Sequence, residues 1–371
     1  MRKISMASLV VALLAFAGCE EEGPPAAPPT PTAKPQTSEA RPKEAPKLTG
    51  QQLAERVKEC AAIHETGDQK RMRECYAPDI EHTAVDSLPP RQYHGPDEVV
   101  AQYKEFHDAF SGYKYELAVI LVNGMEVVAF GSIHGVHAHE FINLPPTNNK
   151  IGVLFGQHVV ATPEGKRGKV SLWMDYTNVF AQFGGLPPED AAQVRPAQES
   201  GKWGTTLVAI AKNDQKEKDN LALYDKRIEA FNAHKADDVV ALYAEDAVLK
   251  DATQKEDRVG ADIKKGLEVF YKMSSDVKST PTWKWAAEDY VASRATVAGT
   301  FDGPMPGGKA PTKKPFSLQY LDVVKIENGK IKQHWRFGNS QKFAVDVGLI
   351  PPPESRTPNA PAASSAAPKG R

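Results

Sequence analysis

Three of the ten histidines of the chain lie close together in residues 133–150, IHGVHAHEFINLPPTNNK. Side chains alternate between the two faces of a strand, so His137 and His139 should share one face and His134 should lie on the other. Imidazoles spaced in this way can bind a metal ion, transfer protons near neutral pH, or line a polar strand face. These alternatives imply different functions.

The turns that follow this segment predict its neighbours. PPTNNK predicts a hairpin turn centred between Thr147 and Asn148, which would set His137 opposite His158. The next turn, in EGKRGK, would bring Asp175 to the same face. The sequence thus predicts a row of these two histidines and Asp175 across three strands. The row lacks a further fixed metal ligand, so an acid/base or polar ligand pocket, or a merely polar face, is expected and no metal site.

Length and charge set broad limits. The chain has 371 residues, enough for two domains that each bury a core, and a formal net charge of -1. A net charge this close to zero does not favour binding to nucleic acid or to an anionic surface, and no nucleic-acid partner is expected. The charge run KRGK, residues 166–169, is interpreted as a solvated turn.

The N-terminal residues predict a location outside the cytoplasm. A basic start, MRK, precedes an apolar run that is too short to span a bilayer. LLAFAGC resembles the lipobox of bacterial lipoproteins, which implies a signal peptide over 1–19 and a lipid on Cys19; a plain signal peptide is the alternative. Residues 20–47 and 353–371 have almost no large apolar side chains, which predicts a disordered tether and tail. We expect a lipid-anchored protein of the cell envelope, periplasmic or on the outer membrane.

The other two cysteines are Cys60 and Cys75. Each lies on the apolar side of a predicted helix, and a turn at Gly67-Asp68 would bring the two helices together at matching heights. In an oxidising compartment this arrangement predicts a disulfide; two buried thiols are the alternative.

The chain repeats itself. CYAPDIEH resembles LYAEDAVL, HVVATPEGK resembles DVVKIENGK, and FGGLPP resembles VGLIPP. Gly135 and Gly299, Gly165 and Gly329, and Gly184 and Gly348 are separated by the same number of residues. Two copies of one domain are therefore expected, at 48–188 and 221–352, joined by a connector at 189–220.

Each copy has the same predicted pattern. Helical periodicity marks three N-terminal segments, the second of which ends in the motif YA.D, and β-branched runs separated by Gly, Pro and Asn follow. Helices followed by a series of strands predict an α+β fold with a curved, mainly antiparallel sheet.

The motifs YA.D, G..E(V/I), G.H...F...PPT and dGK, in this order, resemble the cone-shaped superfamily of nuclear transport factor two. The first copy resembles SnoaL-type polyketide cyclases, through GVHAHEFINLPPTNNK and WMDYTNVFAQFG. The second copy, with AHKADDVVALYAEDAVLKDA and YLDVVKIENGKI, resembles ketosteroid isomerases. The resemblance implies that the histidine row lines the cavity of a cone, and that domain 1 packs on domain 2 as a pseudo-dimer.

The resemblance also implies roles for carboxyl groups. Asp175 matches the acid/base residue of SnoaL-type cyclases. Asp251 matches the general base of ketosteroid isomerases, and Asp322 matches their protonated, hydrogen-bond-donating aspartic acid. The histidine row corresponds in the second copy to Phe301, Asp322 and Asn339. The expected ligand-binding residues are His139, His82, Asn339 and Trp335, beside the expected catalytic residues Asp175, His158, His137, Asp251 and Asp322.

Two functional hypotheses follow. In one, domain 1 binds a small apolar or polyketide-like molecule, with cyclase- or isomerase-like acid/base chemistry that needs no metal or cofactor. In the other, two degenerate cone domains form a non-catalytic scaffold of the cell envelope. Three histidines in one copy, with none at the matching positions of the other, favour the pocket.

Overall fold

The computed structural model describes residues 48–351, apart from 86, 88, 89, 142, 143, 187–190 and 306. The predicted signal peptide with Cys19, the tether and the C-terminal tail lie outside the described residues. In the part of the chain that is described, no helix is long and apolar enough to cross a membrane.

Domain 1, residues 48–210, carries a seven-stranded sheet in the order β2-β1-β6-β5-β4-β3-β7. Its strands are β1 (Tyr76–Ala84), β2 (Arg91–His94), β3 (Phe110–Asn123), β4 (Glu126–His137), β5 (Lys150–Ala161), β6 (Arg167–Met174) and β7 (Leu207–Ile210). Its helices are α1 (Gly50–Thr66), α2 (Gln69–Glu74), α3 (Gly95–Ala109) and α4 (Tyr176–Gln182).

Domain 2, residues 214–351, repeats the arrangement with six strands in the order β10-β11-β12-β13-β8-β9. Its strands are β8 (Tyr243–Asp251), β9 (Arg258–Val259), β10 (Lys278–Ala287), β11 (Tyr290–Thr300), β12 (Pro315–Glu327) and β13 (Lys330–Phe337). Its helices are α6 (Gln215–Asn232), α7 (Ala236–Val240), α8 (Ala261–Met273) and α9 (Ser340–Asp346).

The predicted α+β class with a mainly antiparallel sheet is confirmed, although the order of elements differs in one respect. The YA.D motif begins a strand in each copy, at Tyr76 and Tyr243, rather than ending a helix. Each of these strands pairs in parallel with the last long strand of its sheet, β1 with β6 and β8 with β13. A third parallel pair joins β3 to β7, which lies within the predicted connector.

Helix α1 shows how local sequence sets up the interior of domain 1. Thr49 and Gln52 form a capping box at its start, and Gly67 ends it in a left-handed conformation at φ 69°. Apolar spacing turns Leu53, Cys60 and His64 toward the sheet, and all three are buried. A disulfide joins Cys60 to Cys75, the pair expected from the sequence, and fixes this helix to the start of β1.

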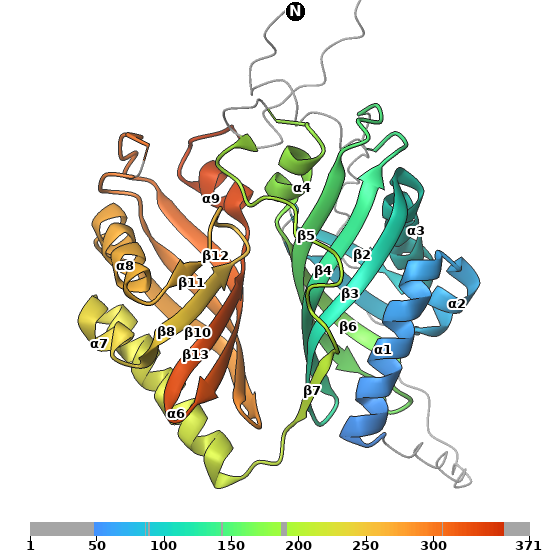
Figure 1. Ribbon diagram of the computed structural model, residues 1–371, viewed down its shortest axis with the longest axis horizontal. Coiled ribbons are helices and arrows are strands. Elements are labelled where there is room, and N and C mark those ends of the chain that lie inside the picture. The colour runs from blue at the N-terminus through green and yellow to red at the C-terminus, as the bar shows by residue number, and fades with distance from the viewer. Residues whose placement is uncertain are drawn as a thin grey trace, which may run out of the picture.

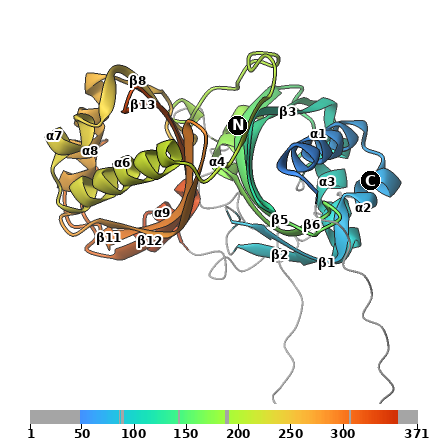
Figure 2. The same ribbon diagram turned by 90° about the horizontal axis from the view of Figure 1, so that it is seen from below.

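Each sheet curls around its own helices and turns its outer face toward the other sheet (Figures 1 and 2). The two enclosed faces bury separate apolar cores, one in each domain. The outer faces meet in a third apolar cluster that includes Phe130 and Trp173 of domain 1 and Trp335 of domain 2. Gly156 lies against domain 2, where an added Cβ would be 2.7 Å from the ring of Phe337. We call the enclosed face of each sheet its inner face, and the contact between outer faces the inter-sheet interface.

Candidate functional site

His137 and His158 do not face each other, so the predicted row is wrong. The hairpin connection runs over residues 138–149 rather than turning at PPTNNK, and β4 pairs Val136 with Lys150. His158 therefore pairs with Val128, which is an odd number of residues away from His137, its expected partner. An odd shift of register moves a side chain to the other face of the sheet. His137 lies on the inner face, and His158 lies on the outer face.

His158 belongs to the inter-sheet interface. Its ring centroid lies 4.3 Å from that of Trp283 in domain 2, and its Nε2 lies 3.1 Å from the carboxylate of Glu126. His134 shares the outer face, where its Nε2 lies 2.7 Å from the hydroxyl of Ser132. Burial lowers the pKa of both imidazoles.

His137 contacts aromatic side chains, among them Phe183, which follows directly after α4. Its ring lies 4.8 Å from that of Phe183 and 5.5 Å from that of Phe110, and its Nδ1 is 3.1 Å from the hydroxyl of Thr147. His139 is exposed, because β4 ends at His137 and the alternation of faces ends with it. The expectation that His139 lines a pocket is therefore wrong.

Asp175 lies between the domains rather than in a cone. Its carboxylate caps α4 through the N–H of Thr177 and accepts hydrogen bonds at 2.9 and 3.0 Å from the hydroxyl of Ser340 in domain 2. Burial, reinforced by the nearby charge of Asp251, raises the pKa of Asp175 to about 6, against the lowering effect of these hydrogen bonds. Asp175 shares the outer face with His158 but is not its neighbour. His158 pairs with Ser171 on β6, whereas Asp175 lies beyond the end of that strand.

Three more of the predicted residues in domain 2 lie at or near the contact between the domains. Asn339 caps α9 and donates to the carbonyl of Val85, and Trp335 stacks on Phe130 with ring centroids 4.8 Å apart. Asp251 accepts from the hydroxyl of Thr253, and its carbonyl accepts from Arg195 in the segment before β7. These contacts correct the prediction that Asn339 and Trp335 line a ligand pocket.

Asp322 lies in the interior of domain 2, but it is not a protonated donor. Arg336 donates from Nε to Oδ1 at 2.8 Å and from Nη2 to Oδ2 at 3.2 Å, and the Nε2 of His334 lies 3.0 Å from Oδ1. The hydroxyl of Tyr224 donates to Oδ2 at 3.3 Å. Although burial alone would raise the pKa of Asp322, the charges and hydrogen bonds of Arg336 and His334 hold it well below its usual range. The carboxyl is ionised, which contradicts the role implied by the resemblance to ketosteroid isomerases.

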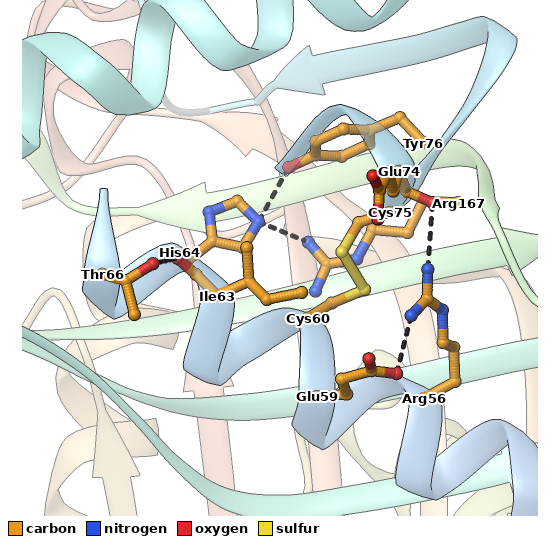
Figure 3. The surroundings of a disulfide bond; sticks show 10 residues. All are labelled: Arg56, Glu59, Cys60, Ile63, His64, Thr66, Glu74, Cys75, Tyr76 and Arg167. Atoms are coloured by element: carbon orange, nitrogen blue, oxygen red, sulfur yellow. Dashed lines mark hydrogen bonds and ion pairs between the residues drawn. A yellow bond between two sulfur atoms is a disulfide. The ribbon is translucent and has the colours of Figure 1, made fainter. Parts of the chain in front are cut away.

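The interior of domain 1 holds a different polar cluster, and Figure 3 shows three of its residues, His64, Tyr76 and Arg167, beside the disulfide. The Nε2 of His64 on α1 lies 2.9 Å from the hydroxyl of Tyr76 and 3.5 Å from Nη1 of Arg167, the first residue of β6. The aromatic rings of Tyr103 and Tyr115 lie 4.2 and 5.6 Å from that of His64. We call these five residues, together with His82, the interior cluster.

His82 was expected to contact a ligand, and it lies on the inner face of β1. It is 1 % exposed, its ring is 6.0 Å from that of Tyr103, and neither of its ring nitrogens has a hydrogen-bond partner. Burial and then the charge of Arg167 lower its pKa to about 3. The same two causes, in the same order, hold the pKa of His64 well below its usual range. Both imidazoles are therefore neutral near pH 7.

The family model for the SnoaL-like polyketide cyclase matches residues 51–183 and again residues 222–344. The chain belongs to this family. Three solved structures are similar to part of the chain. AclR from Streptomyces galilaeus is 25% identical over 36% of this chain and 84% of its own, with a TM-score of 0.34. IdmH from Streptomyces antibioticus is 22% identical over 35% and 98%, with a TM-score of 0.31. TsrD from Streptomyces laurentii is 18% identical over 37% and 98%, with a TM-score of 0.33. A comparison with curated protein sequences finds no match.

Strand pairing shows which residues of the two SnoaL-like domains correspond. In domain 2, Asp322 pairs with Ser293 on one side and Arg336 on the other. In domain 1, the inner-face residue flanked in the same way is Gln157, between Ala129 and Leu172. Sequence alignment had matched His158 to Asp322, one residue away and on the wrong face.

The second SnoaL-like domain holds a related but different cluster, in which the hydroxyl of Tyr243 accepts from Nε of the buried Arg227 at 2.8 Å and lies 2.9 Å from Nδ1 of His334. Tyr76 pairs with Arg167, whereas the equivalent Tyr243 pairs with Ile331. Gln157 is fully buried and neither atom of its amide has a partner. The first domain thus has a buried guanidinium and no carboxylate in place of Asp322.

Sequence reasoning missed Arg167 and His64. Arg167 lies in the KRGK run that was interpreted as a solvated turn, yet its side chain is 3 % exposed. No local signal marked Arg167: strict alternation from the inner-face Val170 would place it on the outer face, and the irregular pairing of β1 with β6 between Tyr76 and Glu81 turns it inward. For His64, the signal was its helical spacing from Cys60, which places both on the buried side of α1.

Proposed function

We propose that the first SnoaL-like domain binds a small, largely apolar molecule in its interior, with a polar end at the interior cluster. The supporting observation is the concentration there of buried polar atoms without a hydrogen-bond partner. Buried polar groups in folded proteins are nearly always paired, so a cluster of unpaired ones needs a cause. The unpaired atoms are Nδ1 of His64, Nδ1 and Nε2 of His82, Nε and Nη2 of Arg167, and the hydroxyl oxygens of Tyr103 and Tyr115.

The apolar part of the ligand would lie against the aromatic side chains beside this cluster. Tyr103 and Phe106 lie one turn apart on the buried face of α3. The ring of Phe106 lies 5.0 Å from that of Phe141, which in turn lies 5.3 Å from that of Phe110. Aromatic side chains in mutual contact therefore extend from the phenol hydroxyls to the phenyl rings, an arrangement that suits a molecule with one polar end.

The second SnoaL-like domain would act as a rigid support. In its interior, Arg336 and His334 bond to the carboxyl group of Asp322, and the buried Arg227 donates to the hydroxyl of Tyr243. In its described interior, the hydroxyl of Tyr271 is the one buried polar atom without a partner. An interior whose polar groups already have hydrogen-bond partners within the chain offers few free groups to a ligand.

The proposal covers binding and no reaction, because the residues expected to carry acid/base chemistry do not meet. His137 lies on the inner face, whereas His158 and Asp175 contact domain 2. Neutral histidines with lowered pKa values are weak bases near pH 7.

Matched substitutions in the two domains test the proposal. His82 pairs with Val170, and Leu249 takes the same place beside His334 in domain 2. Trp at either position overfills an interior, at a cost of about 1–3 kcal/mol. We expect native mass spectrometry of the full-length protein, purified from its own membranes, to find one small molecule per chain. That molecule should be lost in His82→Trp and retained in Leu249→Trp, with both variants folded by circular dichroism. Equal retention in the two variants, or no bound molecule in the wild type, would favour the scaffold hypothesis.

We also propose that the protein is held at the cell envelope by a lipid on Cys19. The lipobox-like LLAFAGC and the proline-rich residues that follow support this. Cys19→Ser should move the protein from the membrane fraction to the soluble fraction, and unchanged membrane association would refute the anchor.

A further inference from the structure

We infer that the polar end of the ligand is an anion, a carboxylate or an oxyanion on an apolar body, and that the guanidinium of Arg167 binds it. The inference rests on the proposed function, because it assumes that domain 1 takes a ligand. It adds the charge of the ligand and the residue that selects for it.

Arg167 is a buried cation without a counter-ion. Its side chain is 3 % exposed, and among the described residues no carboxylate pairs with it. The groups that act on its charge are phenols, chiefly those of Tyr76, Tyr115 and Tyr103, which are neutral near pH 7 because burial raises their pKa values. Burying an unpaired charge costs several kcal/mol, so such a residue is retained where something else compensates for the cost.

The atoms that lack partners have the geometry to hold a carboxylate. In domain 2, Arg336 binds Asp322 through its Nε and Nη2. In Arg167 these same two nitrogens are buried without a hydrogen-bond partner, whereas Nη1 lies near His64. The Nε–Nη2 edge of a guanidinium matches the two oxygens of a carboxylate. Arg336 thus has a carboxylate partner within the chain, whereas the same edge of Arg167 has no hydrogen-bond partner.

The surrounding groups are mostly hydrogen-bond donors. A guanidinium has only N–H donors, and a neutral imidazole has one. The free phenol hydroxyls of Tyr103 and Tyr115 can also donate. Gln157 stands where domain 2 has Asp322, so the fold places no negative charge at that position. A site with surplus donors and a fixed positive charge favours an acceptor-rich, negatively charged group.

The test compares charged and uncharged probes of the same shape. Calorimetric titration of the full chain with 4-phenylbutyrate and with 4-phenylbutyramide measures the effect of the charge alone. We expect the carboxylate to bind at least ten-fold more tightly than the amide. Arg167→Met should abolish that preference and weaken carboxylate binding on the order of ten- to a hundred-fold. Arg167→Lys keeps the charge but loses the paired nitrogens of the guanidinium. Its affinity for the carboxylate should lie between those of the wild type and Arg167→Met.

Stability separates a binding role from a structural one. Arg167→Met removes an uncompensated buried charge, so its urea midpoint should equal or exceed that of the wild type. The opposite result would have two parts: a lower urea midpoint for Arg167→Met, and a preference for the carboxylate over the amide that persists in both Arg167→Met and Arg167→Lys. Together these would show that Arg167 is structural and would overturn the inference. Equal binding of amide and carboxylate, unchanged in Arg167→Met, would overturn the anion while leaving the pocket in place. Binding of neither probe would overturn the pocket and the anion together.

Discussion

Arg336 holds Asp322 through its Nε and Nη2 at 2.8 and 3.2 Å, whereas these two nitrogens of Arg167 in the other domain are buried and unpartnered. These two buried guanidinium groups thus have opposite surroundings. The charge of Arg336 is neutralised within the chain, whereas the groups beside Arg167 are neutral. This difference supports our proposal that domain 1 binds the ligand.

Removing Arg336 should destabilise the protein, whereas removing Arg167 should not. Arg336→Met leaves the buried carboxylate of Asp322 without its main partner, which should lower the free energy of unfolding by about 3–5 kcal/mol. Urea denaturation followed by circular dichroism measures this, with Asp322→Asn/Arg336→Met as the control that removes both charges. The double variant should recover part of the loss. If Arg336→Met and Arg167→Met have the same effect, the contrast between the domains is wrong.

Acid should destabilise the protein through His82. The pKa of His82 falls from 6.5 in the unfolded chain to about 3 in the folded protein, so the unfolded state takes up the proton first. Its contribution to stability is present above pH 6.5 and is lost as the pH falls toward 3. Between pH 7.5 and 5 the loss amounts to about 2 kcal/mol. His82→Phe should show a correspondingly smaller decline in urea midpoint over this interval, while Leu249→Phe, a similar enlargement without a titrating group, should decline like the wild type.

Asp175 should act in the opposite direction. Its pKa rises from 3.8 to about 6 on folding, so its contribution is fully present below pH 3.8 and is lost as the pH rises through about 6. The loss is about 3 kcal/mol over that range. Asp175→Asn keeps an acceptor for Thr177 and Ser340 but does not ionise. The free energy of unfolding of this variant, relative to the wild type, should therefore increase from pH 4 to pH 7. A difference that does not change with pH would contradict the burial of an ionisable carboxyl between the domains.

The disulfide should stabilise the region that carries the interior cluster. Cys60 and Cys75 are separated by 15 residues and join α1 to the start of β1, next to Tyr76. A loop of this length corresponds to about 3 kcal/mol. Dithiothreitol should lower the urea midpoint of the wild type to that of Cys60→Ala/Cys75→Ala and leave the double variant unchanged. An unreduced wild type whose two cysteines are both alkylated by iodoacetamide would show that the bond is not formed.

The sequence predicted the fold well, because repeats and periodicity report on many residues at once. Recurrent motifs located both copies of the domain, and the spacing of Leu53, Cys60 and His64 marks the buried side of α1. The details of individual strands were less secure. The YA.D motif was assigned to a helix, although Tyr76 and Tyr243 each begin a strand.

The predicted site failed for a specific reason. Which face a strand residue occupies depends on the parity of its register, and that parity depends on the length of each connection. Proline and asparagine in PPTNNK suggested a tight turn, but the chain needs residues 138–149 to connect β4 to β5. The error placed His158 with His137. It also hid Gln157, the neighbouring residue on the inner face.

Arg167 was missed because charge in a glycine-containing run is usually exposed. Only the pairing of Tyr76 with Arg167 across β1 and β6, two strands far apart in sequence, shows that this arginine turns inward. A non-local parallel pair leaves no pattern in a local window of sequence.

We propose above all that the ligand site is the interior of domain 1 and not the inter-sheet interface. Nuclear magnetic resonance of the full chain labelled at histidine Cε1 tests it directly, with signals assigned by single substitutions. On titration with 4-phenylbutyrate, the signals of His64 and His82 should shift while those of His134 and His158 stay in place. Shifts of His134 and His158, with His64 and His82 unchanged, would place the ligand between the domains and contradict the claim.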